Sequence, residues 1–186
     1  MAADPEPTLV TPRTFIVATP DEVIFRRLQV DDFFADLDLG PAAGADASER
    51  VASVRFGPEW PGETIDLARR AELRRSGGAD GVAATVVDRV TLEAIGQVGC
   101  QAPPDADGVV EVRYATNADL RDRGIATEAG GAFVEWLLAQ PGVAAVVAEC
   151  RVDNAASVRV IEKLGFALVE EREDEGGRVL RWEKRA

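Results

Sequence analysis

The region from residue 109 to residue 149 constrains the fold more than any other part of the chain. Residues 109–116 alternate between apolar and polar, which predicts a strand. A helix is expected over 125–139, with one apolar stripe and a Pro-Gly stop. Residues 143–149 are apolar on both faces, which is typical of a central strand flanked by helices. Strand, helix and buried strand in this order predict a parallel, right-handed crossover.

The remaining patterns predict further strands and helices around this crossover. Strands are expected at 15–18, 23–28, 81–90, 91–101, 166–171 and 178–182, and helices from Asp31, over 61–75 and over 155–164. The chain should therefore adopt an α/β (α+β) fold: a mixed, mostly antiparallel central sheet with one parallel βαβ crossover and helices on both faces. Residues 1–13 are rich in proline and acids and are expected to form a flexible N-terminal arm. Residues 14–186 are expected to form a single domain.

Composition excludes several classes of function. The 186 residues carry a formal net charge of −12, which disfavours nucleic acid as a partner because phosphate binding needs a basic surface. The chain has no histidine, so a Ser-His-Asp triad and a histidine metal site are excluded, and we expect no metal. Cys100 and Cys150 are expected to be reduced, partly buried thiols. The longest apolar run, 143–148, is too short to cross a membrane, and the N-terminus lacks a secretion signal, so we expect a soluble cytoplasmic protein.

The turn Arg121-Asp122-Arg123-Gly124-Ile125-Ala126-Thr127 precedes the helix of the crossover. Several N–H groups at a helix start lack an intrahelical partner, and the helix dipole adds partial positive charge there. Gly124 permits a positive φ and a close backbone approach, and Ala126 is small. The turn is therefore able to bind a phosphorylated ligand, although a glycine turn alone is more typical of an ordinary loop.

Two motifs and their order resemble a known family. Arg121-x-x-Gly124-x-Ala126 matches the acetyl-CoA signature of the GNAT superfamily of N-acetyltransferases. The block from Asn154 to Phe166 is similar to the next block of that family. The strand Glu111-Val112-Arg113-Tyr114 resembles that of the branch that acetylates ribosomal-protein N-termini, the ribosomal-protein alanine N-acetyltransferases. The resemblance implies transfer of an acetyl group from acetyl-CoA, as co-substrate, to a primary amine by direct attack in a ternary complex.

The resemblance also implies roles for individual residues. The strand end would pair with the pantetheine amides, the turn would hold the pyrophosphate through its main chain, and an asparagine would bond the cofactor arm near the thioester. The cofactor-binding residues implied in this way are Tyr114, Ala115, Thr116, Arg121, Arg123, Gly124, Ile125, Ala126, Thr127 and Asn154. Asn154 is also a good helix N-cap by itself.

Acyl transfer needs a base for the amine and a proton for the departing thiolate. Without histidine, a carboxylate acting through water is expected as the base, with Glu111 as the first candidate and Glu93 and Glu149 as alternatives. Many family members protonate the thiolate with a tyrosine in the last helix, but this chain has Ile161 there. The ribosomal branch often has a serine earlier in that helix, which makes Ser157 the candidate proton donor.

The identity of the acceptor stays open at this level. A protein N-terminus, a small amine or an aminoglycoside-type antibiotic would each suit an acetyltransferase. A catalytically weak acyl-CoA-binding regulatory module and a site for another phosphorylated ligand are rival interpretations. Folds of this kind frequently form dimers, so a homodimer is among the expected assemblies.

Overall fold

The computed structural model describes residues 9–18, 55–56, 83–100 and 102–186. The described strands form one sheet in the order β1-β2-β4-β5-β6-β7-β9-β8, with β3 paired to β5. The strands are β1 (Leu9–Val10), β2 (Thr14–Ala18), β3 (Arg55–Phe56), β4 (Ala83–Asp88), β5 (Glu93–Cys100), β6 (Val109–Thr116), β7 (Ala145–Arg151), β8 (Ala167–Asp174) and β9 (Gly177–Arg185). The helices are η1 (Ala118–Leu120), α4 (Ile125–Leu138) and α5 (Ala155–Lys163).

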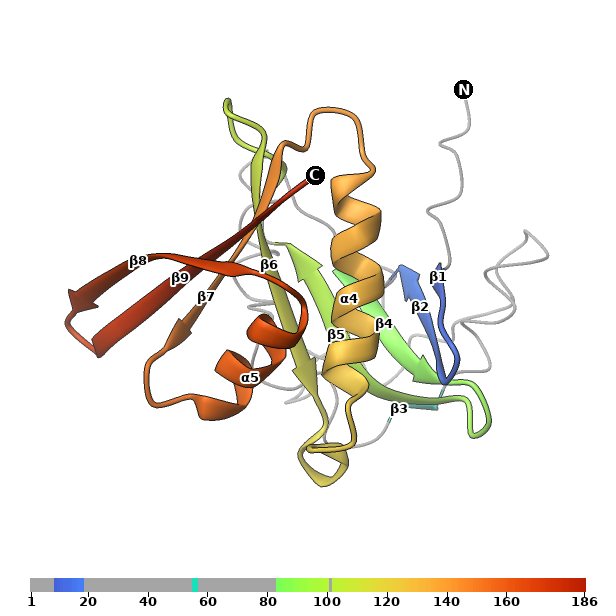
Figure 1. Cartoon of the computed structure of the whole chain (residues 1–186). Helices are drawn as coiled ribbons and strands as arrows, with labels where there is room; N and C mark the ends of the chain where they lie inside the picture. The colour runs from blue at the N-terminus through green and yellow to red at the C-terminus, as the bar shows by residue number, and fades with distance from the viewer. Residues whose placement is uncertain (1–8, 19–54, 57–82, 101) are drawn as a thin grey trace, which may run out of the picture.

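The sheet is mixed and mostly antiparallel, as predicted. Neighbouring strands pair antiparallel except at β6–β7, which are joined by the predicted crossover through α4, and at the short β3–β5 contact. Figure 1 shows α4 lying across the sheet, with α5 beside its lower half. The strand predicted at 23–28 and the helices predicted from Asp31 and over 61–75 lie outside the described residues.

The core lies between α4 and the sheet. One stripe of the helix, Ile125, Ala129, Phe133 and Leu137, is buried against the central strands. The β7 residues 145–148 are buried on both faces, which agrees with their continuous apolar sequence. Burial of each large apolar side chain of this kind stabilises the fold by about 1.5–3 kcal/mol. This packing fixes the start of α4 relative to the end of β6.

Residues 9–13, which composition placed in the flexible arm, belong to the sheet region of the structure. Leu9 and Val10 pair with Ile16 and Phe15 in an antiparallel hairpin. Thr11 is buried, and its N–H donates to the Thr14 carbonyl at 2.9 Å. The hairpin turn brings Arg13 beside α4.

The C-terminal hairpin is longer than the sequence pattern indicates. Register pairs continue to Asp174 and Gly177, so the connection is a two-residue turn at Glu175 and Gly176. Gly177 has φ of 110°, a conformation that side chains disfavour. Every residue of β8, the edge strand beside β9, is exposed. Figure 1 shows this hairpin projecting away from α4.

Candidate active site

The strands β6 and β7 lie together at one end and separate at the other. Their parallel register covers three pairs, from Val109 with Ala145 to Glu111 with Val147. Beyond that point, residues 112–116 of β6 pair with β5, and the rest of β7 pairs with β9. Figure 1 shows the two strands diverging downward. Among the described strands, one main-chain edge of β6 is therefore left without a neighbour over Val112–Thr116.

This edge of β6 includes the three residues that the sequence assigned to the cofactor arm. Tyr114, Ala115 and Thr116 are each partly buried, at the end of the strand next to the opening. The Thr116 hydroxyl oxygen is buried and has no hydrogen-bond partner among the described residues. An extended ligand with amide groups can pair with such an edge in the way that an added strand does.

The turn between β6 and α4 ends in a left-handed glycine at the helix start. Asp122 and Gly124 have φ values of 60° and 77°, and Gly124 is the N-cap residue of α4. Within the described chain, no side chain caps this helix end. The first hydrogen bond of α4 runs from the Glu128 N–H to the Gly124 carbonyl, at 3.0 Å. The N–H groups before Glu128 are therefore able to bind an anion.

The side chains around this turn divide between the core and the surface. Ile125 is buried and anchors the helix start, while Ala126 and Thr127 are half-buried. Gly124 is exposed, so its backbone is open to a ligand. Ile125 can take part in ligand binding through its main chain, since its side chain is in the core.

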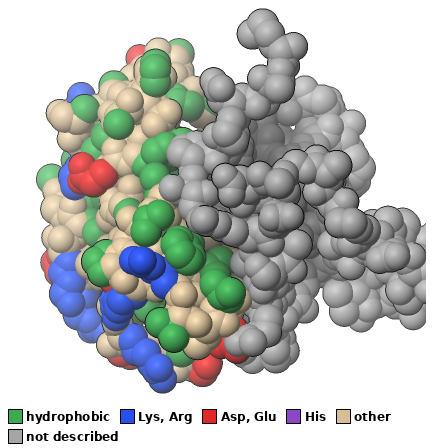
Figure 2. Space-filling model, turned by 90° about the vertical axis from the view of Figure 1, so that its right-hand side faces the viewer, with side chains coloured by type: hydrophobic (Ala, Val, Ile, Leu, Met, Phe, Trp, Pro, Cys, Tyr) green, Lys and Arg blue, Asp and Glu red, His purple; other side chains and the backbone are tan. Residues whose placement is uncertain are grey.

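Basic side chains gather around the same turn. Arg121 and Arg123 are exposed, and Arg159 of α5 lies 4.0 Å from the Asp122 carboxylate. Figure 2 shows Lys and Arg side chains concentrated at the lower left of the described surface, the level at which the β6–α4 turn lies in Figure 1. In a chain with a net charge of −12, this local positive charge favours an anionic ligand at the start of α4.

The first turn of α5 contacts the separated half of β6. The Asn154 carboxamide oxygen accepts from the Ser157 N–H at 3.1 Å and caps the helix. The Tyr114 hydroxyl donates to the Ser157 carbonyl at 3.3 Å. Burial raises the pKa of Tyr114 above its usual range, although a hydrogen bond with the Ser157 side chain opposes the rise. Tyr114 therefore stays protonated at neutral pH and connects β6 to α5.

Ser157 is half-buried, and a hydrogen bond with its side chain lowers the Tyr114 pKa against the effect of burial. The N-cap role foreseen for Asn154 is present, and it uses the carboxamide oxygen. Its amide nitrogen has no partner within the described part of the chain.

Ile161, at the position of the tyrosine in many relatives, is 1% exposed and belongs to the core. That position supplies packing and cannot donate a proton.

The carboxylates proposed as bases differ in their surroundings. Glu111 lies at the last paired position of β6, where β7 begins to separate, and its carboxylate is 2.9 Å from the Arg113 guanidinium. Glu149 of β7 is held by Arg172 at 2.7 Å and by Arg181 at 2.8 Å. The hydrogen bond from Arg172 is the largest effect on the Glu149 pKa, and with Arg181 it lowers that pKa against the opposing effect of burial. Glu149 is therefore a weak base with a structural role, and it is withdrawn as a candidate.

A sequence model of the acetyltransferase (GNAT) domain matches residues 23–167. The chain belongs to the GNAT family. A Bacillus subtilis (strain 168) protein, the uncharacterized N-acetyltransferase YjdG, is 32% identical over 139 residues, which is 72% of this chain and 83% of YjdG. The chain is accordingly an N-acetyltransferase, and acetyl-CoA is the acetyl donor that the GNAT family uses.

Solved structures of GNAT enzymes share the fold at low sequence identity. The ribosomal L7/L12 α-N-protein acetyltransferase RimL, solved with coenzyme A, aligns with a TM-score of 0.64 and 14% identity, covering 96% of this chain and 97% of RimL. The ribosomal-protein-S5-alanine acetyltransferase from Vibrio fischeri aligns with a TM-score of 0.54 and 19% identity, covering 64% of this chain and 68% of that one. Among the described residues, no helix of this GNAT chain is long and apolar enough to span a membrane.

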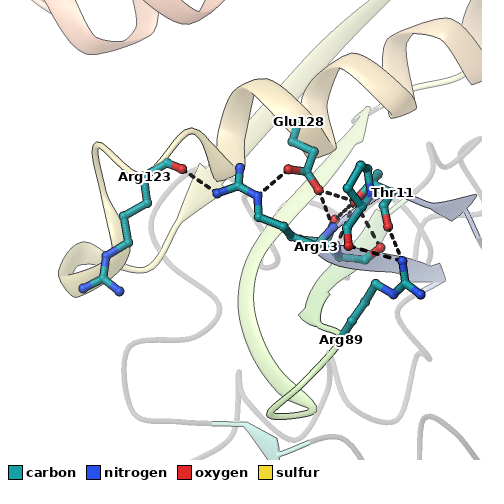
Figure 3. A network of polar contacts seen from close by, with 7 residues as sticks. Thr11, Arg13, Arg89, Arg123 and Glu128 are labelled. Atoms are coloured by element: carbon teal, nitrogen blue, oxygen red, sulfur yellow. Dashed lines mark hydrogen bonds and ion pairs between the residues drawn. The ribbon is translucent and has the colours of Figure 1, made fainter.

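Sequence reasoning missed one group of residues beside the turn between β6 and α4. Figure 3 shows Arg13 reaching from the N-terminal hairpin to Glu128 in α4 and to the main chain of Arg123. Thr11 and Arg89 complete this network, in which the Arg89 guanidinium donates to the Thr11 carbonyl at 2.8 Å. No local pattern predicts these contacts, since Arg13 and Glu128 are 115 positions apart.

Proposed function

We propose that this GNAT enzyme binds acetyl-CoA in the opening between β6 and β7 and transfers the acetyl group to an α-amine, such as a protein N-terminus. The observation that carries the proposal is the coincidence of two features. The free edge of β6 ends beside the uncapped start of α4, where Gly124 has φ of 77°. A ligand with amides at one end and a diphosphate at the other matches this pair of sites.

Different residues bind different parts of the cofactor. Main-chain groups of Tyr114, Ala115 and Thr116 pair with the pantetheine amides, and N–H groups from Arg121 to Thr127 hold the diphosphate. The Asn154 amide nitrogen, which its capping role leaves without a partner in the described residues, donates to the cofactor arm near the thioester. Each hydrogen bond to a charged oxygen contributes about 1.5–3 kcal/mol, so several main-chain donors suffice without a lysine.

The chemistry uses the carboxylate and the hydroxyl at either side of the opening. Glu111 accepts a proton from the ammonium through water, and the neutral amine attacks the thioester carbonyl. The tetrahedral intermediate then collapses and the C–S bond breaks. Ser157 gives its proton to the departing thiolate and regains one from the nitrogen of the intermediate, so the products are the neutral amide and the thiol. Ser157 is suited to this step because it is only half-buried and lies in the first turn of α5, against the separated half of β6.

The acceptor class follows from the cost of deprotonation. A lysine-like amine with a pKa of about 10.4 costs roughly 4.6 kcal/mol to deprotonate at pH 7, whereas an α-amine near 8 costs about 1.4 kcal/mol. The less basic amine suits an enzyme with a lone carboxylate base and no histidine. The names of two structural neighbours, which act on ribosomal proteins, agree with a protein N-terminus as acceptor.

Thermal unfolding with ligands tests the cofactor half of this proposal. A ligand that binds the native state raises the melting temperature, so acetyl-CoA and CoA should stabilise the protein while ATP and NAD should not. Thiol release should then be measured with N-terminal peptides, spermidine, free amino acids and an aminoglycoside. Fastest release with peptides supports the proposal. Stabilisation without thiol release for any amine would favour a regulatory acyl-CoA-binding module instead.

A further inference from the structure

We propose that Arg13 and Glu128 form a positioning pair that holds the Gly124 N–H in the direction needed to bind the cofactor diphosphate. The inference rests on the proposed function, because it requires that the turn at Gly124 binds the cofactor diphosphate. It assigns a task to two residues that lie outside the site already described. Arg13 would act through the main chain of the turn and would make no contact with the cofactor itself.

The Arg13 side chain is fixed by the first turn of α4. One Glu128 carboxylate oxygen accepts from the Arg13 N–H at 2.8 Å, and the other accepts from Arg13 Nε at 2.6 Å. The Thr11 hydroxyl lies 2.5 Å from the first of these oxygens. The Glu128 side chain is 17% exposed. Paired, charge-assisted hydrogen bonds of this kind fix both distance and orientation.

The fixed guanidinium then reaches the turn. Arg13 Nη1 donates to the Arg123 carbonyl at 2.8 Å (Figure 3). In a trans peptide the C=O and the following N–H point in opposite directions. Holding the Arg123 carbonyl toward Arg13 therefore turns the Gly124 N–H away from the β1–β2 hairpin. In the strand order, the β6–β7 opening lies on the side away from that hairpin.

The turn needs this restraint because of its own sequence. Glycine populates positive and negative φ about equally, so the Arg123–Gly124 peptide is intrinsically free to rotate. A rotated peptide would present the carbonyl oxygen to the diphosphate in place of the N–H. Arg13 Nη2 lies 3.5 Å from the point where a Gly124 Cβ would be, so the guanidinium also packs against this residue.

Replacing Glu128 tests the inference, because two possible roles of this residue predict opposite changes in CoA affinity. Its negative charge lies in the first turn of α4, close to the proposed diphosphate site. If it acted on the ligand through charge alone, replacing it with alanine would strengthen CoA binding. If it positions Arg13, the same replacement weakens CoA binding. The two mechanisms therefore predict opposite results.

The experiment compares Arg13→Met, Arg13→Lys and Glu128→Ala with the wild-type protein. The control is Lys184→Met, because Lys184 also joins a glutamate of α4, Glu135 at 2.6 Å, to a main-chain carbonyl, but in the second half of the helix. The dissociation constant for CoA is measured by calorimetry and that for pantetheine, which lacks the diphosphate, by ligand-observed NMR. Thermal unfolding verifies that each variant is folded.

We expect Arg13→Met and Glu128→Ala to weaken CoA binding about tenfold, the effect of losing one hydrogen bond to a charged group. Pantetheine binding should change less than twofold, and Lys184→Met should leave both constants unchanged. Arg13→Lys keeps the positive charge but lacks the several N–H donors of a guanidinium, so its CoA affinity should lie between those of Arg13→Met and the wild type. Unchanged or tighter CoA binding by Glu128→Ala, complete rescue by Arg13→Lys, or equal loss of pantetheine binding would overturn the inference. A wild-type protein that binds no CoA would instead refute the proposed function, and this inference with it.

Discussion

Replacement of Gly124 by glutamate is expected to abolish most cofactor affinity while the protein stays folded. Gly124 has φ of 77° and ψ of 8°, the left-handed conformation, which costs a residue with a side chain about 1–2 kcal/mol. The added Cβ would meet Arg13 Nη2 at 3.5 Å, an ordinary contact. For a chain of this size, each kcal/mol lowers the melting temperature by about 2–4 °C. The variant should therefore melt a few degrees lower and remain native at 25 °C.

The effect on CoA should be much larger than the effect on stability. Two like charges about 4 Å apart repel by about 1 kcal/mol in water and about 4 kcal/mol at an effective dielectric constant of 20. These limits correspond to a dissociation constant between about fivefold and about a thousandfold higher. Gly124→Ala introduces the backbone strain without the charge, so the difference between the two variants isolates the electrostatic part.

Calorimetric titration with CoA is the assay, and Gly142→Glu is the matched control. Gly142 has φ of 84° and open space around its Cβ position, but it follows the other end of α4. The same substitution there carries similar backbone strain and the same added charge. A Gly124→Glu variant that binds CoA within twofold of the wild type would refute the diphosphate site. So would an equal loss of affinity in Gly142→Glu.

Three further outcomes are expected. Ser157→Ala should lower kcat about a hundredfold, the lower range for a general acid, with the CoA dissociation constant nearly unchanged; wild-type turnover would remove Ser157 from the mechanism. Glu111→Gln should reduce kcat/KM for an amine acceptor by a similar factor at pH 7 and by less at pH 9, where the amine is itself deprotonated. An equal loss at both pH values would contradict its role as the base. Burial favours a raised pKa for Glu128, but hydrogen bonds from Thr11 and Arg13 outweigh it and lower the pKa from 4.5. The stability that these bonds contribute is present above pH 4.5 and is lost as the pH falls through the lowered value. The melting-temperature difference between wild type and Glu128→Gln should therefore shrink in acid. A difference that does not depend on pH would disprove this linkage.

Local patterns were sufficient for the elements that surround the site. The alternation of residues 109–116 predicted β6 with the bounds that the structure has, Val109–Thr116. The apolar stripe and the Pro141-Gly142 stop predicted α4 to within a residue at its C-terminal end. Gly165, directly after the helix predicted over 155–164, has φ of 78°, the left-handed conformation that is common at a helix end. Side-chain periodicity and the conformational freedom of glycine act over a few residues, so one sequence contains this information.

Composition was a poor guide to residues 9–13. Prolines and acids predicted a flexible arm over 1–13, yet Leu9 and Val10 pair with β2, and Arg13 bonds to α4. The partners that order these residues are themselves distant in sequence, as Glu128 is from Arg13. Composition describes the average solvation of a segment and carries no information about such specific partners.

In the candidate site, too, some features follow from the sequence and others only from the tertiary structure. The sequence by itself determined the glycine turn, the helix start, the N-cap at Asn154 and the absence of histidine. The tertiary structure alone decided that β6 and β7 separate after Glu111 and Val147, and that two arginines neutralise Glu149 while Arg113 alone pairs with Glu111 among the described residues. The physical reason is that strand register and ion pairing depend on which segments the packed core brings together, and a local pattern does not encode that choice.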